Sequence, residues 1–214
     1  MTQIDRQSIP VPTLRRMPAY CNYLKSLSVK GIVYVSTTAV ANDLNLIPIQ
    51  VRKDFEYTRL SGKPKIGYNL ELLIEAIEYI LGWNKMSNAV IAGVGNLGKA
   101  LLSYQGFKNY GLDIIAGIDQ DKKKHGKEVA GRKVYPPEQI GVLVKENKIG
   151  IGIITVPAES AQLMADLFVK NGITALWNFA PVRLNVPADV VVQNENLASS
   201  LAVLSQRIKQ QKEK

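Results

Sequence analysis

The sequence predicts an α/β protein in two parts: a small helical domain with a basic hairpin, then a parallel-sheet domain that ends in a separate helix. Residues 1–70 hold ten Lys and Arg against four Asp and Glu, whereas residues 71–214 hold seventeen against fourteen. The first part shows apolar residues at helical spacing, and the second alternates short β-rich runs with helical segments. A chain of 214 residues with 46% hydrophobic side chains can bury two small cores.

Composition limits where the chain works and how it responds to oxidation. No run of eighteen uncharged apolar residues occurs, and Ile9–Pro12 is too short for an export signal, so a cytoplasmic protein is expected. Cys21 is the single cysteine, which excludes an internal disulfide and a cysteine-rich metal site. A redox response would therefore come through a bound molecule or, as the weaker alternative, through cross-linking of two chains.

The first segment predicts two helices on either side of a short strand. Apolar residues at helical spacing indicate a first helix with Thr13 as its N-cap. The run Ile32–Val35 indicates a strand. A short helix over Ala39–Leu44 follows, capped by Ser36 or Thr37.

A third helix and a basic hairpin complete the first domain. Pro48 begins the helix, and Val51 and Phe55 point inward. Its outward-facing side chains are polar, namely Gln50, Arg52, Lys53 and Glu56. Gly62–Tyr68 has the glycines and lysines of a basic hairpin tip. This order of elements is that of a winged helix-turn-helix.

The rest of the chain predicts a Rossmann-type parallel sheet. A helix over Leu70–Leu81 ends at Gly82 and bridges the two domains. Strands separated by helices imply parallel βαβ units. We expect five strands, over Ala89–Ala92, Ile114–Ile118, Ile149–Val156, Ala175–Phe179 and Val190–Val192. A last helix begins near Leu197, so the expected segments are residues 1–82, 83–195 and 196–214.

A glycine-rich turn indicates a dinucleotide site. Gly93–Gly98, with the sequence GVGNLG, directly follows an apolar strand and opens a helix. Gly93 permits the tight turn, Gly95 lets a pyrophosphate approach the backbone, and Gly98 lets helix and strand pack closely. The helix N-terminus offers unpaired N–H groups and a positive dipole end to phosphates.

Asp119 supports the same site. It ends the next predicted strand, 21 residues after Gly98, where a carboxylate accepts the adenosine ribose hydroxyls and repels a 2′-phosphate. NAD(H) is therefore favoured over NADP(H). Alternatively, Asp119 only starts a turn, and Lys122–Lys124 could accommodate a phosphate, although a solvated surface run is the preferred interpretation of these lysines.

The chain lacks an evident catalytic group, so the site is interpreted as a sensor. A dehydrogenase needs an acid/base or a nucleophile at the nicotinamide. His125 lies in the lysine-rich loop and Cys21 in the first domain, while a Tyr or Lys proton donor stays open. The alternatives are an NAD-dependent oxidoreductase and a CoA-binding Rossmann subunit with a basic N-terminal module.

Basic residues on three elements of the first domain indicate DNA. Arg52 and Lys53 suit the major groove, where an Arg fork can meet guanine O6 and N7. Lys63 and Lys65 could reach phosphates or the minor groove. The remaining candidates are Arg15 and Arg16 at the start of the first helix, as backbone contacts, and Gln50. Each residue alone could be a solvated cation, but their joint placement favours double-stranded DNA.

Together these motifs resemble the Rex family of bacterial repressors. The resemblance is carried by Arg15-Arg16-Met17-Pro18-Ala19-Tyr20, Gln50-Val51-Arg52-Lys53-Asp54, Gly67-Tyr68, Gly93 to Leu101 and Asn178-Phe179-Ala180-Pro181. It implies a homodimer with winged-helix and Rossmann domains, in which the last helix is swapped between subunits. It also implies a repressor without enzyme activity that releases an inverted-repeat operator when NADH binds, and NAD+ opposes this release.

The resemblance also implies roles for individual residues. It places the pyrophosphate at Gly93, Val94, Gly95, Asn96, Leu97 and Gly98, and the adenosine ribose at Asp119. It places Tyr104 and Phe107 near the nicotinamide. The rest of the pocket would come from Thr155, Val156 and Pro157 and from Asn178, Phe179, Ala180 and Pro181. The segment 196–214 would be the dimerisation helix.

Three departures from the family pattern bear on the switch. Asn22 and Asn196 stand where family members carry an Arg and an Asp that form an ion pair between subunits in one redox state. An amide pair is the most that these two side chains can form. Pro64 interrupts the usual basic wing tip, which affects the minor-groove contact.

Overall fold

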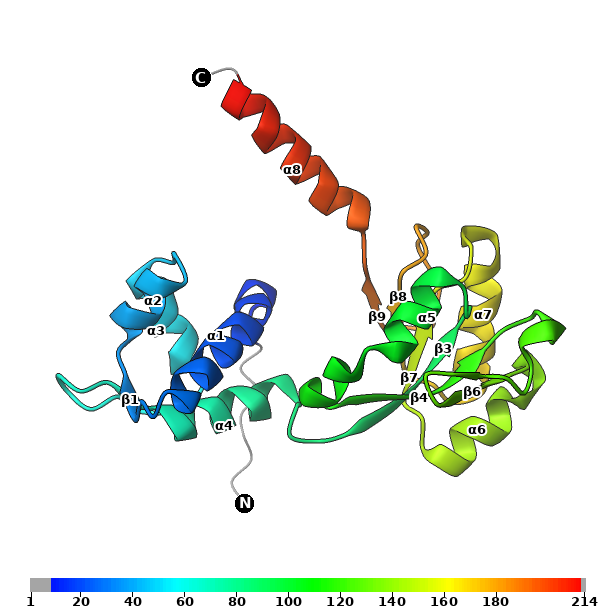
Figure 1. The fold of residues 1–214 in the computed structure, drawn as a ribbon, viewed down its shortest axis with the longest axis horizontal. Helices are drawn as coiled ribbons and strands as arrows, with labels where there is room; N and C mark the ends of the chain where they lie inside the picture. The colour runs from blue at the N-terminus through cyan, green and yellow to red at the C-terminus, as the bar shows by residue number, and fades with distance from the viewer. Residues whose placement is uncertain (1–8, 213–214) are drawn as a thin grey trace. The chain divides into compact units, whose positions relative to one another are not determined.

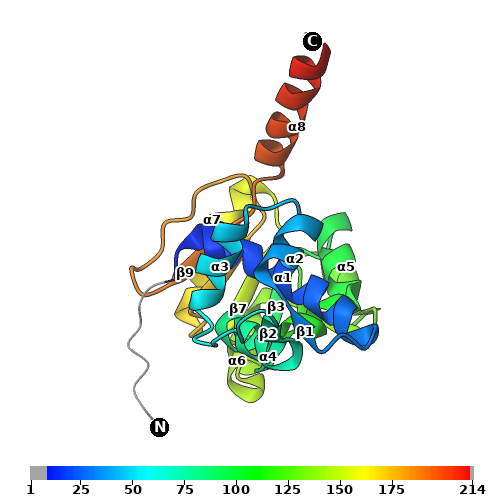
Figure 2. The same cartoon turned by 90° about the vertical axis from the view of Figure 1, so that its left-hand side faces the viewer.

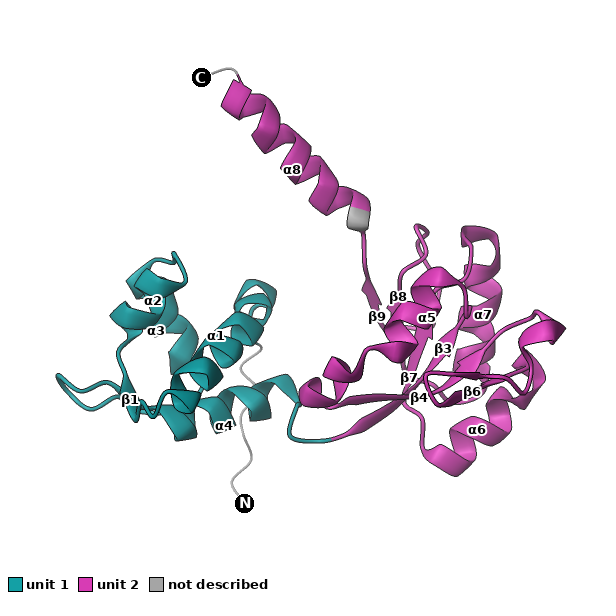
Figure 3. Ribbon diagram, in the orientation of Figure 1, with its two compact units in different colours: residues 1–85 teal, residues 86–214 magenta. Residues whose placement is uncertain are grey.

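The computed structural model describes residues 9–212, except for the side chain of Leu197. The chain divides into two compact units, residues 1–85 and 86–214 (Figure 3). This division lies three residues after the expected boundary between residues 82 and 83, and it keeps the C-terminal helix with the second unit.

Unit 1 contains the elements of a winged helix-turn-helix, as predicted (Figure 1). Its helices and strands are α1 (Val11–Val29), β1 (Tyr34–Val35), α2 (Thr37–Asp43), α3 (Pro48–Glu56), β2 (Tyr68–Asn69) and α4 (Leu70–Leu81). Strands β1 and β2 pair antiparallel, and a bridge between Lys63 and Gly67 closes the tip of the wing.

The expected start of α1 is wrong. The helix begins at Val11 with Pro10 in the N-cap position, and Thr13 lies buried inside the helix. Thr13 instead donates its hydroxyl hydrogen bond to Asp54, 2.9 Å away on α3, so its side chain joins two helices. The Ser36 cap is confirmed, because its side chain accepts a hydrogen bond from the backbone N–H of Ala39.

The core of unit 1 is built around Phe55. This ring is fully buried on the inner face of α3 and meets Tyr20 of α1 edge to face, with centroids 5.4 Å apart. Tyr68 of β2 makes a similar contact at 5.5 Å. Because edge-to-face pairs are favourable, these contacts hold α1 and the base of the wing against α3. Figure 2 shows the ribbon of these elements with unit 1 toward the viewer.

Unit 2 is a seven-stranded sheet in the order β5-β6-β4-β3-β7-β8-β9. The predicted strands appear as β3 (Ser87–Ala92), β4 (Leu112–Ile118), β7 (Ile151–Ile154), β8 (Ala175–Asn178) and β9 (Val191–Asn194). The sequence missed β5 (Glu128–Val129) and β6 (Arg132–Tyr135). Both are short and lie at one edge of the sheet, where charged side chains hide the strand pattern. Within this sheet, β5 and β6 pair antiparallel, and the other described strand pairs are parallel.

Helices cover both faces of this sheet (Figure 1). They are α5 (Asn96–Ser103), η1 (Gln105–Tyr110), η2 (Lys122–Lys124), η3 (Pro137–Gln139), α6 (Ile140–Asn147) and α7 (Ala158–Lys170). Val90 and Ala92 of β3 pack in a core with α6 and α7, whereas Ala89 and Ile91 pack on the other face with α5. The alternation along β3 therefore builds one core on each face.

The last helix, α8 (Leu197–Lys212), has no buried residue among Ala198–Lys212. Leu201, Val203, Leu204 and Ile208 are large apolar residues that remain exposed. Among the described residues, no helix combines the length and apolar character needed to cross a bilayer.

We expect Phe168→Ala to lower the free energy of unfolding of the protein by about 3–5 kcal/mol, because it opens a cavity in the core. Phe168 on α7 is fully buried. Its ring packs against Gly152, where a Cβ would come within 2.5 Å of a ring carbon. Urea denaturation followed by circular dichroism measures the change. Leu163→Ala, at an exposed position of the same helix, is the control and should change stability by less than about 0.5 kcal/mol.

Candidate functional site

The carboxyl ends of four parallel strands lie side by side in unit 2. The last residues of β3, β4, β7 and β8 pair in register: Ala92 with Ile118 and Ile154, and Ile154 with Asn178. The residue after each strand end is therefore brought to the same edge of the sheet. The chain passes from β3 to β4 on one side and later to β7 on the other, so this edge is a topological switch point, where such sheets bind ligands.

The glycines of the turn after β3 are required by close contacts. Gly93 has φ +89°, and a Cβ there would lie 2.9 Å from the backbone of Thr155. A Cβ on Gly98 would lie 1.9 Å from the carbonyl oxygen of Gly93, so α5 packs directly on the turn. A Cβ on Gly95 would meet no atom within 4 Å. The turn is therefore closed on its inner side and open at Gly95.

Thr155 ties this turn to the neighbouring strand β7. Its backbone N–H donates to the carbonyl of Ala92, and its hydroxyl lies 2.8 Å from the carbonyl oxygens of both Ala92 and Gly93. Val156 lies against Gly93, and Pro157 is the exposed N-cap residue of α7. Thr155 is thus occupied in shaping the turn.

Asp119 lies beside the same turn. One carboxylate oxygen accepts a hydrogen bond from the Val94 backbone N–H and an ion pair from Lys124 Nζ, both at 2.8 Å. The other oxygen accepts the backbone N–H of Asp121 at 2.9 Å. Burial opposes ionisation of Asp119, but the bonds from Lys124, Asp121 and Val94 outweigh it and hold its pKa below the usual range. Asp119 is therefore a carboxylate at neutral pH.

The lysines after Asp119 do not all form a solvated run. Lys122 and Lys123 are exposed, but Lys124 is half-buried and paired with Asp119. The ring of His125 also lies against this turn, with Nε2 2.8 Å from the carbonyl oxygen of Asp119. The interpretation of Lys124 as a solvated surface residue is wrong, because its charge neutralises part of the Asp119 carboxylate.

An aromatic row lies on the α5 side of the sheet. Tyr104 contacts Phe107 at 4.9 Å between ring centroids, Phe107 contacts Trp177 at 5.7 Å, and Trp177 contacts Phe179 at 4.9 Å. The three aromatic residues expected in the pocket thus belong to one row. The sequence did not indicate Trp177 as part of the pocket, because its position on a strand is typical of a core residue. Its indole N–H donates a hydrogen bond to Glu195 at 2.9 Å.

Asn178 organises the loop after β8. Its amide is buried and donates to the carbonyls of Ala180 and Val182, while its side-chain oxygen accepts the backbone N–H of Ala180. It also bonds Asn194 of β9. Asn178 therefore shapes the segment Phe179–Pro181, and its polar atoms are engaged within the loop.

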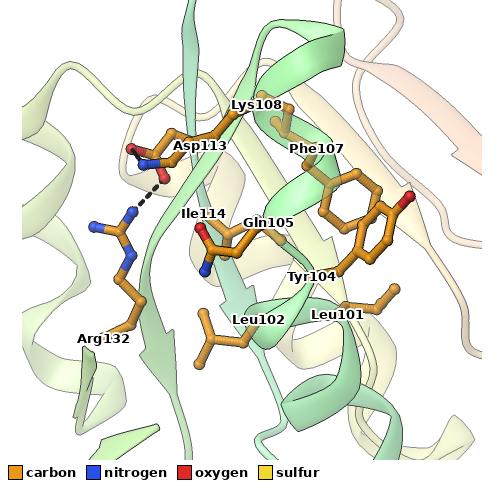
Figure 4. Close-up of a pocket in the computed structure, with 10 residues that line it drawn as sticks. Leu101, Leu102, Tyr104, Gln105, Phe107, Lys108, Asp113, Ile114 and Arg132 are labelled. Atoms are coloured by element: carbon orange, nitrogen blue, oxygen red, sulfur yellow. Dashed lines mark hydrogen bonds and ion pairs between the residues drawn. The ribbon is translucent and has the colours of Figure 1, made fainter. Parts of the chain in front are cut away.

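A small cavity lies at the opposite edge of the sheet (Figure 4). It holds about 10 Å³, roughly room for one water molecule. Its lining includes Asp113 and Arg132 at the starts of β4 and β6, joined by an ion pair. It is too small for a nucleotide and does not include the glycine turn, but Tyr104 and Phe107, the two residues expected near the nicotinamide, also line it.

In unit 1, the predicted DNA contacts occupy the exposed face of α3 and the wing. Arg52 and Lys53 are exposed and Gln50 is half-buried. Lys63 and Lys65 are exposed on the wing, and Lys63 Nζ lies 3.2 Å from the Tyr34 hydroxyl and 5.3 Å from the centre of its ring. Lys65 has φ +63°, so the turn after Pro64 holds a lysine in the left-handed region.

Arg15 and Arg16 differ in their surroundings. Arg15 is exposed, whereas Arg16 forms a two-pronged pair with Asp54, with Nε and one terminal nitrogen 2.7 and 2.8 Å from its oxygens. Tyr20 donates its hydroxyl to the same carboxylate at 2.7 Å. Arg16 is therefore engaged in joining α1 to α3, which the sequence reasoning did not foresee.

Asp54 is the buried acceptor of this network. Burial opposes its ionisation, yet hydrogen bonds from Arg16, Tyr20 and Thr13 outweigh that cost and hold its pKa below the usual range. One feature of the sequence could have indicated this role: Asp54 lies in the Gln50–Asp54 motif, on the inner side of α3, where the neighbouring inward-facing residues are apolar. The network fixes the third helix relative to the first.

The remaining expected switch residues lie on exposed surfaces of their own units. Asn22 is exposed on α1. Asn196 is exposed and its side-chain oxygen accepts the backbone N–H of Ser199 at 3.2 Å, at the start of α8. Cys21 is fully buried, and burial raises the pKa of its thiol to about 11, so cross-linking through it is disfavoured.

Comparisons with known proteins cover nearly the whole chain. Residues 8–56 match the family model described as putative DNA-binding protein N-terminus, and residues 84–182 match the CoA binding domain. A redox-sensing transcriptional repressor named Rex from Treponema denticola is 47% identical over 93% of this chain and 95% of its own. The Rex repressor from Bacteroides thetaiotaomicron is 40% identical over 96% and 94%.

Solved structures agree with these relatives. The structure of RSP in complex with β-NAD+ and operator DNA has a TM-score of 0.90 and 32% identity, covering 96% of this chain and 95% of that one. The structure of RSP in complex with β-NADH has a TM-score of 0.85 and the same 32% identity, with 95% and 96% covered.

We expect Asp54→Asn to lower the free energy of unfolding by about 2–3 kcal/mol, because hydrogen bonds to a charged, buried acceptor are lost. Since the folded pKa of Asp54 is lowered, its contribution is present above the unfolded pKa near 4 and is lost as pH falls through the folded value. In urea titrations from pH 7 to pH 3, the difference in the free energy of unfolding between the parent protein and Asp54→Asn should become smaller. Glu56→Gln, on the exposed face of α3, is the control, and a pH-independent gap would contradict this account.

We expect Gly98→Ala to destabilise the protein by about 1–3 kcal/mol, since the new methyl overlaps the Gly93 carbonyl. Gly95→Ala is the matched control, because its added methyl meets open space. Thermal unfolding should separate the two variants. Equal melting temperatures for both would show that the close approach of α5 to the turn is unimportant.

Proposed function

The chain belongs to the Rex family of redox-sensing transcriptional repressors, and on that premise we propose that it binds operator DNA as a homodimer and releases it when NADH binds. The single observation that carries this proposal is that one chain combines a basic winged helix-turn-helix with a glycine turn and a carboxylate at the switch point of a parallel sheet. Such a protein works in the cytoplasm, where the chromosome lies.

Four groups of residues fit a bound NAD(H). The turn Gly93–Gly98 would hold the pyrophosphate against its backbone, with the open side at Gly95 and the N-terminus of α5 facing the charge. Asp119 would accept the adenosine ribose hydroxyls, in exchange for part of its bonding to Lys124. The wall around the dinucleotide would come from Thr155–Pro157 and Phe179–Pro181, which follow β7 and β8.

The aromatic row supports a preference for the reduced coenzyme. Tyr104, Phe107 and Phe179 offer apolar faces, and the oxidised nicotinamide ring is cationic whereas the reduced ring is neutral. Burying an unpaired cation costs more than burying a neutral ring. The closed form of the dimer would therefore prefer NADH. Each tenfold preference supplies about 1.4 kcal/mol, so an effective switch needs roughly a hundredfold.

The DNA-reading surface would be the exposed face of α3 with the wing. Arg52 and Lys53 point away from the core and suit bases and phosphates of the major groove, while Lys63 and Lys65 suit the backbone or the minor groove. Arg15 adds a cation at the start of α1. NADH would change the spacing of the two α3 helices in the dimer, so that they no longer match successive major grooves of an inverted repeat.

Dimerisation would use α8. Its exposed Leu201, Leu204 and Ile208 recur at helical spacing and make one apolar face. A free apolar helix is costly in water, and exchange of such an element between two identical chains buries it at little cost. Asn196 at the start of α8 and Asn22 on α1 could at most form an amide pair across the dimer, so this switch would be tuned without the ion pair.

The rival functions have weaker support. The Rex relatives that match nearly the whole chain are named as repressors, so the protein is a regulator and not an oxidoreductase. The match to a CoA binding domain covers residues 84–182 alone and reflects the shared Rossmann fold. Competition between CoA and NADH for the purified protein would separate a CoA site from an NAD(H) site.

The deciding experiment is fluorescence anisotropy of the purified protein on a labelled inverted-repeat duplex. We expect NADH to release the DNA and an excess of NAD+ to oppose that release. Titration at several salt concentrations reports the phosphate contacts. If both coenzymes left binding unchanged, the redox-sensing role would be wrong, and if no duplex bound, the repressor role would be wrong.

Two substitutions should separate the two activities. Arg52→Ala should weaken operator binding by about 1–3 kcal/mol and leave NADH affinity intact, because the side chain lies in unit 1. Asp119→Asn should weaken NADH binding, measured by calorimetry, while Asp121→Asn, an exposed neighbour, serves as control. Equal NADH affinity of Asp119→Asn and the parent protein would remove Asp119 from the site.

A further inference from the structure

Ile49 is an exposed apolar residue on the face of α3 that carries the cations. It is 58% exposed, and it belongs to none of the three hydrophobic cores. Ile49, Arg52, Lys53 and Glu56 are spaced three, four and seven residues from the first, so they share one face of the helix, and all are exposed. Ile49 is the single apolar member of this row.

The position of Ile49 is the one from which a recognition helix meets bases. It is the second residue of α3, directly after Pro48, and the N-terminal residues of a recognition helix contact base edges in the major groove. Isoleucine has a stiff, branched side chain and no hydrogen-bonding group. It can therefore match only an apolar feature of the groove, and the C5-methyl group of thymine is that feature.

The surroundings of Ile49 favour DNA over a protein partner. Arg52 and Lys53 stand one turn further along the same face. A protein interface is usually marked by a contiguous apolar patch with few charges at its centre. Apart from Ile47, which is exposed just before the helix, the exposed neighbours of Ile49 on this face are cations, and this arrangement instead fits a groove whose walls are phosphates and whose floor carries methyl groups.

We infer that Ile49 contacts a thymine methyl group and so makes each operator half-site prefer thymine at one position. The inference rests on the proposed DNA-binding function and adds a specificity residue to it. Arg52 and Lys53 would then contribute hydrogen bonds and charge, while Ile49 contributes a contact that depends on one methyl group.

The test begins with selection of duplexes from a random library by the parent protein and by Ile49→Ala. Alanine is the best helix former and leaves α3 intact, while it removes most of the apolar surface. The parent protein should select a thymine in each half-site that the variant selects less strictly. Val29→Ala, at an exposed position at the end of α1, is the control and should keep the parental preference.

The second step measures the methyl group directly. Replacing that thymine by deoxyuracil in the selected duplex deletes one methyl and keeps every hydrogen-bonding group. Anisotropy should show about a fourfold loss of affinity per half-site for the parent protein, as expected for one buried methyl, and less than about twofold for Ile49→Ala.

The outcomes separate the inference from the proposed function. If the parent protein selects no duplex, the DNA-binding function itself fails. If it selects a duplex but deoxyuracil weakens the parent and Ile49→Ala equally, or weakens neither, the methyl contact of Ile49 is wrong and the repressor function stands.

Discussion

The close approach of α5 to the end of β3 is the constraint on which unit 2 depends. A single Cβ at Gly98 would overlap the carbonyl of Gly93, so helix, turn and strand form one rigid corner. Thr155 bonds the same carbonyls from β7, and Asp119 bonds the Val94 N–H from β4. The three central strands therefore converge on one turn, and this fixed geometry reduces the ordering cost of binding.

Unit 1 has a comparable constraint in Asp54. A buried carboxylate with its full charge needs every acceptor site satisfied. Arg16, Tyr20 and Thr13 of α1 supply these bonds, so the reading helix α3 cannot shift relative to α1 without breaking them. The inner side of α3 is rigid through Asp54 and Phe55, and its outer side is free to meet DNA.

The two units then divide the chemistry between them. Unit 1 exposes cations and one isoleucine on α3, whereas unit 2 places a carboxylate beside a glycine turn at the carboxyl edge of a sheet and a row of aromatic rings on its α5 face. Lys124 pairs with Asp119 and so prevents an uncompensated half-buried charge. The exposed apolar face of α8 is consistent with the proposed homodimer. An isolated helix gains little stability from helix propensity alone, so packing against a second chain would stabilise it.

The sequence by itself determined the order of elements, the glycine turn, the carboxylate 21 residues beyond it and the basic third helix, because these are local patterns of spacing and side-chain type. Only the tertiary structure decided the partners of those residues. Arg16 meets Asp54 across 38 positions of the chain, and Trp177 of β8 meets Phe107 of η1. The short, charged strand β6 lacks the apolar alternation that marks a strand, so its pairing with β4 and β5 defines it. Local patterns specify what a segment forms, whereas contacts between distant residues are chosen by packing and by the cost of unpaired buried charge.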